Sequence, residues 1–204
     1  MIRRVAQADQ EALTNFFLGL AMPTRYLRFF GALSIGPSMI RILAGGDNAD
    51  AVIATGGGDI VGHGIATYRV GPGSTVMTEI GVVVADEWQG RGVGSALVRA
   101  LIAAAQARGA TVLTMDVLPT NRRVLAMIGS HWPAATMDQS ADSVVVKIRL
   151  QGNQAAPRRP QRSGHEPSGS LGTIGRSNWE YLHSGLRSSR ARSRVRSAKG
   201  SPCP

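Results

Sequence analysis

The chain is nearly devoid of cysteine, and this excludes several classes of protein. Cys203 is the single cysteine among 204 residues, so an intrachain disulfide is impossible and a cysteine-rich metal site is excluded. No group of His, Cys and Asp residues has the spacing of metal ligands, so we expect no metal. So few cysteines are typical of proteins in a reducing compartment.

Long apolar runs are also missing. No segment reaches the roughly 18 consecutive apolar residues of a membrane span. The opening stretch MIRRVAQADQEAL lacks the apolar core of a signal peptide. We therefore expect a soluble, cytoplasmic protein that does not partner a membrane.

The net positive charge is small over most of the chain and concentrated at its end. Residues 1–150 hold 13 Lys and Arg against 11 Asp and Glu, whereas residues 151–204 hold 10 against 2, out of a net charge of +10. The second segment is rich in Ser, Arg, Gly and Pro and poor in aliphatic residues. Such a composition cannot offset the entropy of ordering. We expect a folded domain at 1–150 and a disordered basic tail at 151–204.

The tail leaves two alternatives open. The stretch RSSRARSRVR places arginine at alternate positions, which suits phosphate contacts by an extended chain, so the tail could bind nucleic acid. It could equally be a solvated extension without function. Salt-dependent retention of the isolated tail on DNA would discriminate between the two.

The domain alternates apolar runs with turn signals. Strands are expected at 2–5, 49–55, 61–70, 76–86, 111–118 and 142–150, and helices at 8–20, 23–33, 90–109 and 120–129. Asp9 can cap the first helix. The segment GGGD predicts a hairpin turn between the second and third strands. The order predicts an α+β, or mixed α/β, fold: a mostly antiparallel sheet flanked by helices, with a strand–helix–strand unit late in the chain.

A glycine-rich turn precedes the longest helix, in EWQGRGVGSALV. Unpartnered amides at a helix start suit a phosphate or pyrophosphate. The turn has no Lys for a Walker A loop, and Leu97 stands where a Rossmann fingerprint needs its last glycine. Gln89 to Gly94 fill the pattern Gln/Arg-x-x-Gly-x-Gly/Ala, with Arg91 adding a cation. The alternative is a turn that only packs the helix onto the sheet.

The segment TEIGVVVADEWQGRGVGSALVRALIAAAQARG resembles the acetyl-CoA-binding core of the GCN5-related N-acetyltransferase (GNAT) superfamily. The resemblance covers roughly residues 2–150, because VLPTNRRVLAMI is similar to the next strand and helix of that family, and YLRFF to its bacterial protein-lysine acetyltransferase branch. It implies a GNAT-like fold in which one strand splays from its neighbour and pairs with the pantetheine arm. The residues implied to bind acetyl-CoA are Val82, Val83, Val84, Gln89, Gly90, Arg91, Gly92, Val93, Gly94, Ser95 and Asn121.

Glu79 is the candidate general base. It is the only carboxylate in VMTEIGVVV, and an amine acceptor with a pKa near 10.4 arrives charged, so a base must take its proton. Burial in this strand would raise the pKa of Glu79. The resemblance also implies this role. The alternative is a solvent-facing glutamate, or one paired with Arg69 across the hairpin.

Three further expectations concern neighbouring residues. A backbone N–H near Val82 could stabilise the oxyanion. Many relatives carry a tyrosine where this chain has Ile128, so the general acid stays unassigned. We expect His63 at the surface of its strand, with a position facing the acceptor site as the alternative. We expect Trp132 as an apolar plug, and the Phe pairs at 16–17 and 29–30 in the core, with the wall of the substrate cleft as the alternative.

The sequence therefore predicts an N-acetyltransferase that moves an acetyl group from acetyl-CoA to a primary amine, with a protein lysine as the first acceptor. A small-molecule amine is the alternative acceptor. A non-catalytic acyl-CoA-binding regulator is the alternative of another class, since it would keep the loop without needing Glu79.

Overall fold

The computed structural model describes residues 1–31, 35–140 and 142–150. Within them, a seven-stranded sheet has the order β1-β2-β3-β4-β5-β7-β6. Its strands are β1 (Ile2–Arg4), β2 (Ala49–Gly56), β3 (Asp59–Val70), β4 (Val76–Val84), β5 (Val112–Val117), β6 (Thr136–Gln139) and β7 (Val144–Arg149). All neighbours are antiparallel except β4 and β5, which are parallel. The expected mixed, mostly antiparallel fold is confirmed. The expected basic tail, with its nucleic-acid alternative, lies outside the described residues.

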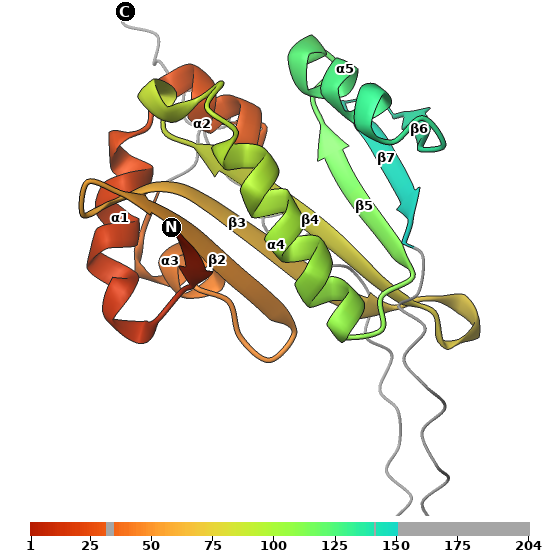
Figure 1. The fold of residues 1–204 in the computed structure, drawn as a ribbon, viewed down its shortest axis with the longest axis horizontal. Coiled ribbons are helices and arrows are strands. Elements are labelled where there is room, and N and C mark those ends of the chain that lie inside the picture. Colours follow the sequence, from red (N-terminus) through yellow and green to blue (C-terminus); the bar gives the residue numbers. More distant parts are fainter. Residues whose placement is uncertain (32–34, 141, 151–204) are drawn as a thin grey trace, which may run out of the picture. The chain divides into compact units, whose positions relative to one another are not determined.

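Helices cover both faces of the sheet (Figure 1). They are α1 (Gln10–Gly19), α2 (Met22–Phe29), α3 (Pro37–Leu43), α4 (Val93–Ala107) and α5 (Arg122–His131), with short 3-10 turns η1 (Gln7–Asp9), η2 (Pro72–Ser74) and η3 (Asp86–Trp88). One face packs against α4 and α5, whose Leu97, Leu101 and Ile128 are buried in a shared apolar core. The other face packs against α1, α2 and α3.

Two glycines of β3 bring α4 close to the sheet. A Cβ at Gly62 would lie 3.0 Å from a methyl carbon of Leu97, and one at Gly64 would lie 2.9 Å from a methyl carbon of Leu101. Larger residues at either position would therefore push α4 away from β3. The hairpin before them turns through Gly57 and Gly58, whose φ angles are +64° and +95°. Both lie in the left-handed region that glycine adopts without strain, as the GGGD segment predicted.

An ion pair anchors the far end of α4. Arg108, its C-cap residue, donates from Nε to Oδ2 of the buried Asp50 at 2.8 Å. Tyr68 donates a second hydrogen bond to the same oxygen at 2.7 Å. Because Asp50 belongs to β2 and Tyr68 to β3, the C-terminus of α4 is tied to two strands. The helix start, which carries the glycine-rich turn, is thereby held in a fixed place.

Two elements and one cap differ from the sequence-based expectation. The helix α3 and the edge strand β6 were not expected, and every residue of β6 is exposed. Asp9 does not cap α1 through its side chain. It accepts hydrogen bonds from Ala6 N at 2.7 Å and from Arg3 at 2.6 and 2.7 Å instead. The hydrogen bonds from Arg3 are the main reason that the pKa of Asp9 falls to about 2.

Truncation after Leu150 should leave the domain folded. The last strand ends at Arg149, and Leu150 completes the packing, since it is buried and its N–H donates to Thr111 O at 2.9 Å. A chain of residues 1–150 should therefore unfold cooperatively within a few degrees of the full chain. Thermal unfolding followed by circular dichroism measures this. A clear loss of folding would show that residues 151–204 pack on the domain.

Candidate functional site

The parallel strands β4 and β5 separate along their length. They pair only from Met77 to Glu79 on β4 and from Val112 to Thr114 on β5. Both strands continue beyond this point, to Val84 and Val117, and they open into a V (Figure 1). The other edge of β4 stays paired with β3 over its whole length. The peptide groups of β4 from Ile80 onward are therefore no longer bonded to β5, as the resemblance implied.

The glycine-rich turn lies at the open end of the V. Gln89 donates from Nε2 to Val84 O at 3.2 Å, which folds the turn back onto the end of β4. The first helical hydrogen bond of α4 runs from Ala96 N to Gly92 O at 3.0 Å. The N–H groups of Val93, Gly94 and Ser95 precede it, so helix geometry gives them no acceptor within α4. Their amides lie at the positive end of a helix of 15 residues.

Backbone conformation favours glycine at two of the three positions in the turn. Gly90 and Gly92 have φ angles of +76° and +80°, so the backbone itself favours glycine at both. Gly94 is helical, and a Cβ there would make only ordinary contact with Val84, at 3.7 Å. A Cβ at Gly92 would meet no described atom within 4 Å. The space above Gly92 is thus open to a ligand, which fits an anion held by the amides.

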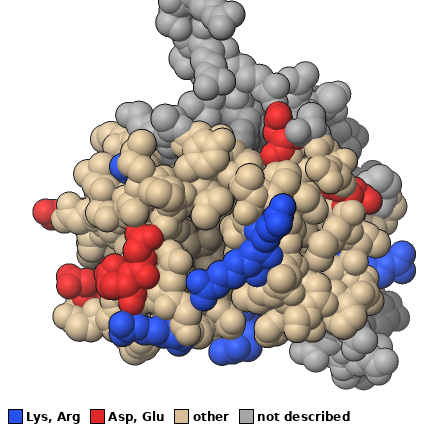
Figure 2. All heavy atoms as spheres, turned by 90° about the horizontal axis from the view of Figure 1, so that it is seen from above, with Lys and Arg blue, Asp and Glu red and all other residues tan. Residues whose placement is uncertain are grey.

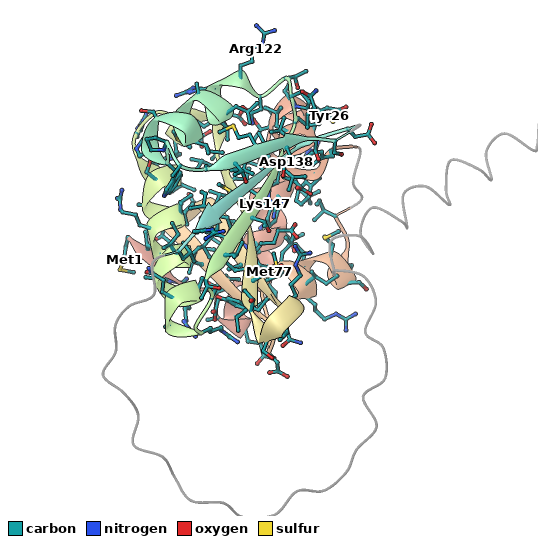
Figure 3. All side chains as sticks on the ribbon, turned by 90° about the vertical axis from the view of Figure 1, so that its right-hand side faces the viewer. Met1, Tyr26, Met77, Arg122, Asp138 and Lys147 are labelled. Carbon is teal, nitrogen blue, oxygen red and sulfur yellow. The ribbon has the colours of Figure 1, made fainter. Side chains whose placement is uncertain are left out.

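Arginines surround this turn. The guanidinium of Arg91 lies over the Trp88 ring, 5.3 Å from its centroid. A nitrogen of Arg123, on α5, would lie 3.4 Å from a Cβ at Gly90, so this side chain reaches across the mouth of the V. Arg122 points away from the sheet (Figure 3). Figure 2 looks onto this end of the molecule and shows a basic ridge beside a hollow, with acidic side chains gathered to one side.

The side chains of Asn121 and of the β4 valines already make contacts within the protein, which limits their contact with a ligand. Asn121 caps α5, where its side-chain oxygen accepts from Val124 N at 3.4 Å. Val82 and Val84 pack against the core under α4, and Val83 is buried on the opposite face. A ligand in the V would therefore meet the backbone of Val82–Val84 rather than three free side chains.

Glu79 is the last residue of β4 that pairs with β5. It lies opposite Thr67 of β3 and Thr114 of β5, and it is half-buried. Arg69 lies opposite Met77, two pairs further along. The structure also links Glu79 to Arg28 of α2, because the charge of Glu79 raises the pKa of that buried arginine. The carboxylate therefore stands where the two strands begin to separate, beside a cation that the sequence did not point to.

His63 is a correction to the sequence-based expectation. It is not at the surface: its side chain is fully buried, with its ring 5.1 Å from that of Phe17. Its Nε2 donates to Leu43 O at 2.8 Å, and burial lowers the pKa of His63 to about 3. The imidazole is neutral at physiological pH and is enclosed by α1 and α3, so it cannot take a proton from an acceptor in the V.

The remaining expectations concern apolar residues. Phe16, Phe17 and Phe29 are buried, as predicted for core residues, whereas Phe30 is only half-buried. Half-buried Trp132 packs against the core as the predicted plug. Ile128 is 1% exposed, so the position of the missing tyrosine is filled by a core side chain. Among residues 1–31, 35–140 and 142–150, no three His, Cys, Asp or Glu side chains are placed to hold a metal ion. In the same ranges, no helix is long and apolar enough to cross a membrane.

Asp86 connects the turn to α2 and was missed by the sequence reasoning. Its Oδ1 accepts from Thr24 Oγ1 at 2.6 Å and its Oδ2 accepts from Ala21 N at 3.1 Å. Asp86 thus caps α2 from a distant part of the chain, since Ala21, the N-cap residue, has no side-chain oxygen. The sequence held one sign of this contact, because no residue with a capping side chain directly precedes Met22.

Removing this cap should loosen α2. Asp86→Ala should lower the free energy of unfolding by about 0.5–1 kcal/mol, the range for losing an exposed cap. Asp86→Asn, which keeps one acceptor oxygen, should cost less. Urea unfolding measures both. Adding Thr24→Ala to Asp86→Ala should cost little more, because the shared hydrogen bond is already gone; full additivity of the two losses would contradict this assignment.

Comparisons with known proteins agree with this geometry. Residues 22–129 match the family model described as "Acetyltransferase (GNAT) family". The chain is 30% identical over 136 residues to "Acetyltransferase Pat" of Mycolicibacterium smegmatis, a match that covers 64% of this chain and 41% of that protein. The chain thus spans less than half the length of this relative.

Solved structures show the same fold. The GNAT domain of S. lividans PAT superposes with a TM-score of 0.65 at 25% identity, over 73% of this chain and 89% of that one. A ribosomal-protein-alanine N-acetyltransferase from Brucella melitensis superposes with a TM-score of 0.60 at 20% identity, over 74% and 99%. The separated strands, the glycine-rich turn and the family match together show that the chain belongs to the GNAT family of acetyltransferases.

Proposed function

We propose that this chain transfers an acetyl group from acetyl-CoA to the side-chain amine of a lysine in a protein. The observation that carries the proposal is the end of the β4–β5 ladder at Glu79. There, a carboxylate stands where unpaired β4 peptide groups begin, and the glycine-rich turn lies at the open end of the same V. A thioester held along β4 would therefore place its carbonyl near Glu79.

The turn holds the donor in this proposal. The free amides of Val93, Gly94 and Ser95, with Arg91 beside them, suit the pyrophosphate of acetyl-CoA. Gln89 and Gly90 shape the turn, and the backbone of Val82, Val83 and Val84 pairs with the pantetheine arm. Asn121 contributes by fixing the start of α5 at the mouth of the V. Acetyl-CoA supplies an activated acetyl group, and the thiolate of CoA is its leaving group.

Glu79 acts as the general base. A lysine amine arrives protonated at neutral pH and cannot attack a carbonyl until it loses a proton. Glu79 takes that proton, and the neutral nitrogen forms a bond to the acetyl carbon. The carbon–sulfur bond then breaks, and the nitrogen loses a second proton to solvent as the amide forms. A backbone N–H of β4 near Val82 stabilises the developing oxyanion. Because Ile128 offers no proton, the leaving thiolate takes one from solvent.

A protein lysine is proposed as the acceptor because the YLRFF stretch resembles the protein-lysine acetyltransferase branch. The similarity to Acetyltransferase Pat and to the GNAT domain of S. lividans PAT supports this choice. A small-molecule amine is the alternative acceptor that the site chemistry also allows.

The test is release of CoA thiol from acetyl-CoA by the full chain, with three acceptors compared: a lysine peptide with a blocked N-terminus, a peptide with a free N-terminus and no lysine, and a small diamine. We expect release to depend on the lysine peptide. Preference for the diamine would replace the proposed acceptor. Tight CoA binding without release for any amine would indicate a non-catalytic regulator.

A further inference from the structure

A buried arginine lies against the candidate catalytic strand. Arg28 of α2 is only 7% exposed, and its guanidinium lies over the Phe29 ring at 5.0 Å. Burial lowers the pKa of Arg28 to about 10, and the charge of Glu79 acts in the opposite direction. Because this value is still far above neutral pH, Arg28 remains a cation. A buried cation is costly unless an anion compensates it.

The guanidinium occupies the place of a missing side chain on β4. A Cβ built at Gly81 would lie 2.6 Å from Cζ and 2.9 Å from Nη1 of Arg28. Glu79 and Gly81 are two residues apart on one strand, so their side-chain directions share one face of the sheet. The guanidinium therefore lies on the face, and at the level of the strand, from which the Glu79 carboxylate projects.

Other ionisable groups also lie on this face, and Asp116 of β5 stands at the level of Gly81, beyond the point where β4 and β5 stop pairing. The residues facing Glu79 directly are Thr67 of β3 and Thr114 of β5, which are uncharged. The ionisable residues on the same face include Arg25 and Arg28 of α2, His63 and Arg69 of β3, Asp116 of β5, Asp138 of β6, and Lys147 and Arg149 of β7. His63 is buried and neutral: burial is the main cause of the low pKa of its imidazole, and the charge of Arg28 lowers that pKa further. Lys147 forms an ion pair with Asp138 at 2.9 Å, and the two are neighbours in Figure 3.

We propose that Arg28 is a positioning residue that keeps Glu79 in its ionised form and fixes it at the point where β4 and β5 separate. The proposal rests on the role of Glu79 as the general base. It gives α2 a role besides packing, because the helix supplies a counter-ion to a half-buried carboxylate. Because Asp86 ties the start of α2 to η3 and Arg28 ties its end to β4, the helix is fixed to the site at both ends.

The sign of the effect follows from electrostatics. A neighbouring cation favours the ionised carboxylate. Without it, Glu79 should hold its proton to higher pH and be unavailable as a base at neutral pH. A merely structural arginine would lower activity equally at every pH instead.

The test is the pH profile of kcat/KM for the full chain with a lysine peptide. Arg28→Gln should move the acidic limb of the profile toward higher pH by about one unit, because an adjacent cation lowers the pKa of a carboxyl group by about 1–3 units. At a pH below the limb, kcat/KM should therefore fall about tenfold. Activity well above the limb should approach that of the wild type. Arg28→Lys keeps the charge and should restore much of the profile, although lysine lacks the planar fork. A uniform loss at all pH values, with no movement of the limb, would overturn the proposal.

A second measurement does not depend on activity. The chain has five glutamates, Glu11, Glu79, Glu87, Glu166 and Glu180, so the carboxyl resonance of Glu79 in protein labelled with carbon-13 at glutamate can be identified by its loss in Glu79→Gln. In Arg28→Gln, or in Arg28→Leu if the first variant does not fold, this resonance should titrate at higher pH than in the wild type. Titration at an unchanged pH would refute the role of Arg28.

The failure of this inference and of the proposed base can be told apart. If Glu79→Gln retains its activity, the base is wrong whatever Arg28 does. If Glu79→Gln is inactive but neither the acidic limb nor the carboxyl titration responds to Arg28, only the role of Arg28 is wrong.

Discussion

Glu79→Gln should lower turnover by about 100-fold to 10,000-fold, the range for losing a positioned base. The substitution keeps the size and polarity of a half-buried side chain and removes its basic oxygen. Affinity for acetyl-CoA should change little, because the amides of the turn and the backbone of β4 hold the donor. The loss should shrink as pH rises, since more of the acceptor amine then arrives deprotonated.

The matched control is Glu11→Gln, an exposed glutamate in the first turn of α1. It should leave turnover unchanged. Steady-state rates across pH, with single-turnover experiments to isolate the chemical step, measure the effect. If Glu79→Gln keeps most of its activity at neutral pH while chemistry limits the rate, water must remove the proton, because His63 is buried and bonded to Leu43 O.

Gly92→Ala should weaken CoA binding by about tenfold to 100-fold. The new methyl group would occupy the open space above the turn, where no described atom lies within 4 Å. It would hold the pyrophosphate away from the amides of α4, and each charge-assisted hydrogen bond lost costs about 1.5–3 kcal/mol, where 1.4 kcal/mol corresponds to tenfold in affinity. Isothermal calorimetry with CoA measures this change.

The strained backbone at Gly92 requires a control, because alanine at a φ of +80° is itself destabilising. Gly109, just beyond the other end of α4, has a φ of +77° and is equally open around its Cβ position. Gly109→Ala should therefore cost similar stability and leave CoA affinity unchanged. An unaltered affinity in folded Gly92→Ala would remove the anion site from this turn.

Local sequence patterns predicted the parts of the molecule whose structure depends on residues close together in the sequence. The long helix after the turn, the hairpin at Gly57 and Gly58 and the buried strands follow from apolar periodicity and from glycine at positions of positive φ. The strands β4 and β5 are distant in the sequence, and nothing in either strand encodes where their pairing ends. That separation came from the resemblance to the family, and the structure confirms it.

Side chains whose neighbours are remote in sequence could not be placed this way. His63 stands between two glycines and was expected at the surface of its strand. Gly62 and Gly64 are instead needed on the α4 face, and α1 and α3 cover His63 on the other. In TRYLRFF, Arg28 lies in a predicted helix, where an arginine usually faces solvent. The burial of Arg28 depends on the absence of a side chain at Gly81, a contact that no local pattern reveals.

The short elements α3 and β6 were not predicted, for a related reason. The edge strand β6 is fully exposed and has no apolar alternation, so its extended form depends on pairing with β7. The start of α3 carried a signal, since Pro37 stands at its first position, but seven residues are too few for a clear helical period.

The most direct measurement of the central claim is mass spectrometry of a lysine peptide with a blocked N-terminus after incubation with acetyl-CoA and the full chain. We expect one added acetyl group, located on the lysine Nζ by fragmentation, and its near absence when Glu79→Gln replaces the wild type at neutral pH. A peptide that gains no acetyl group from a chain that binds CoA, whichever lysine sequence is offered, would contradict protein-lysine acetylation.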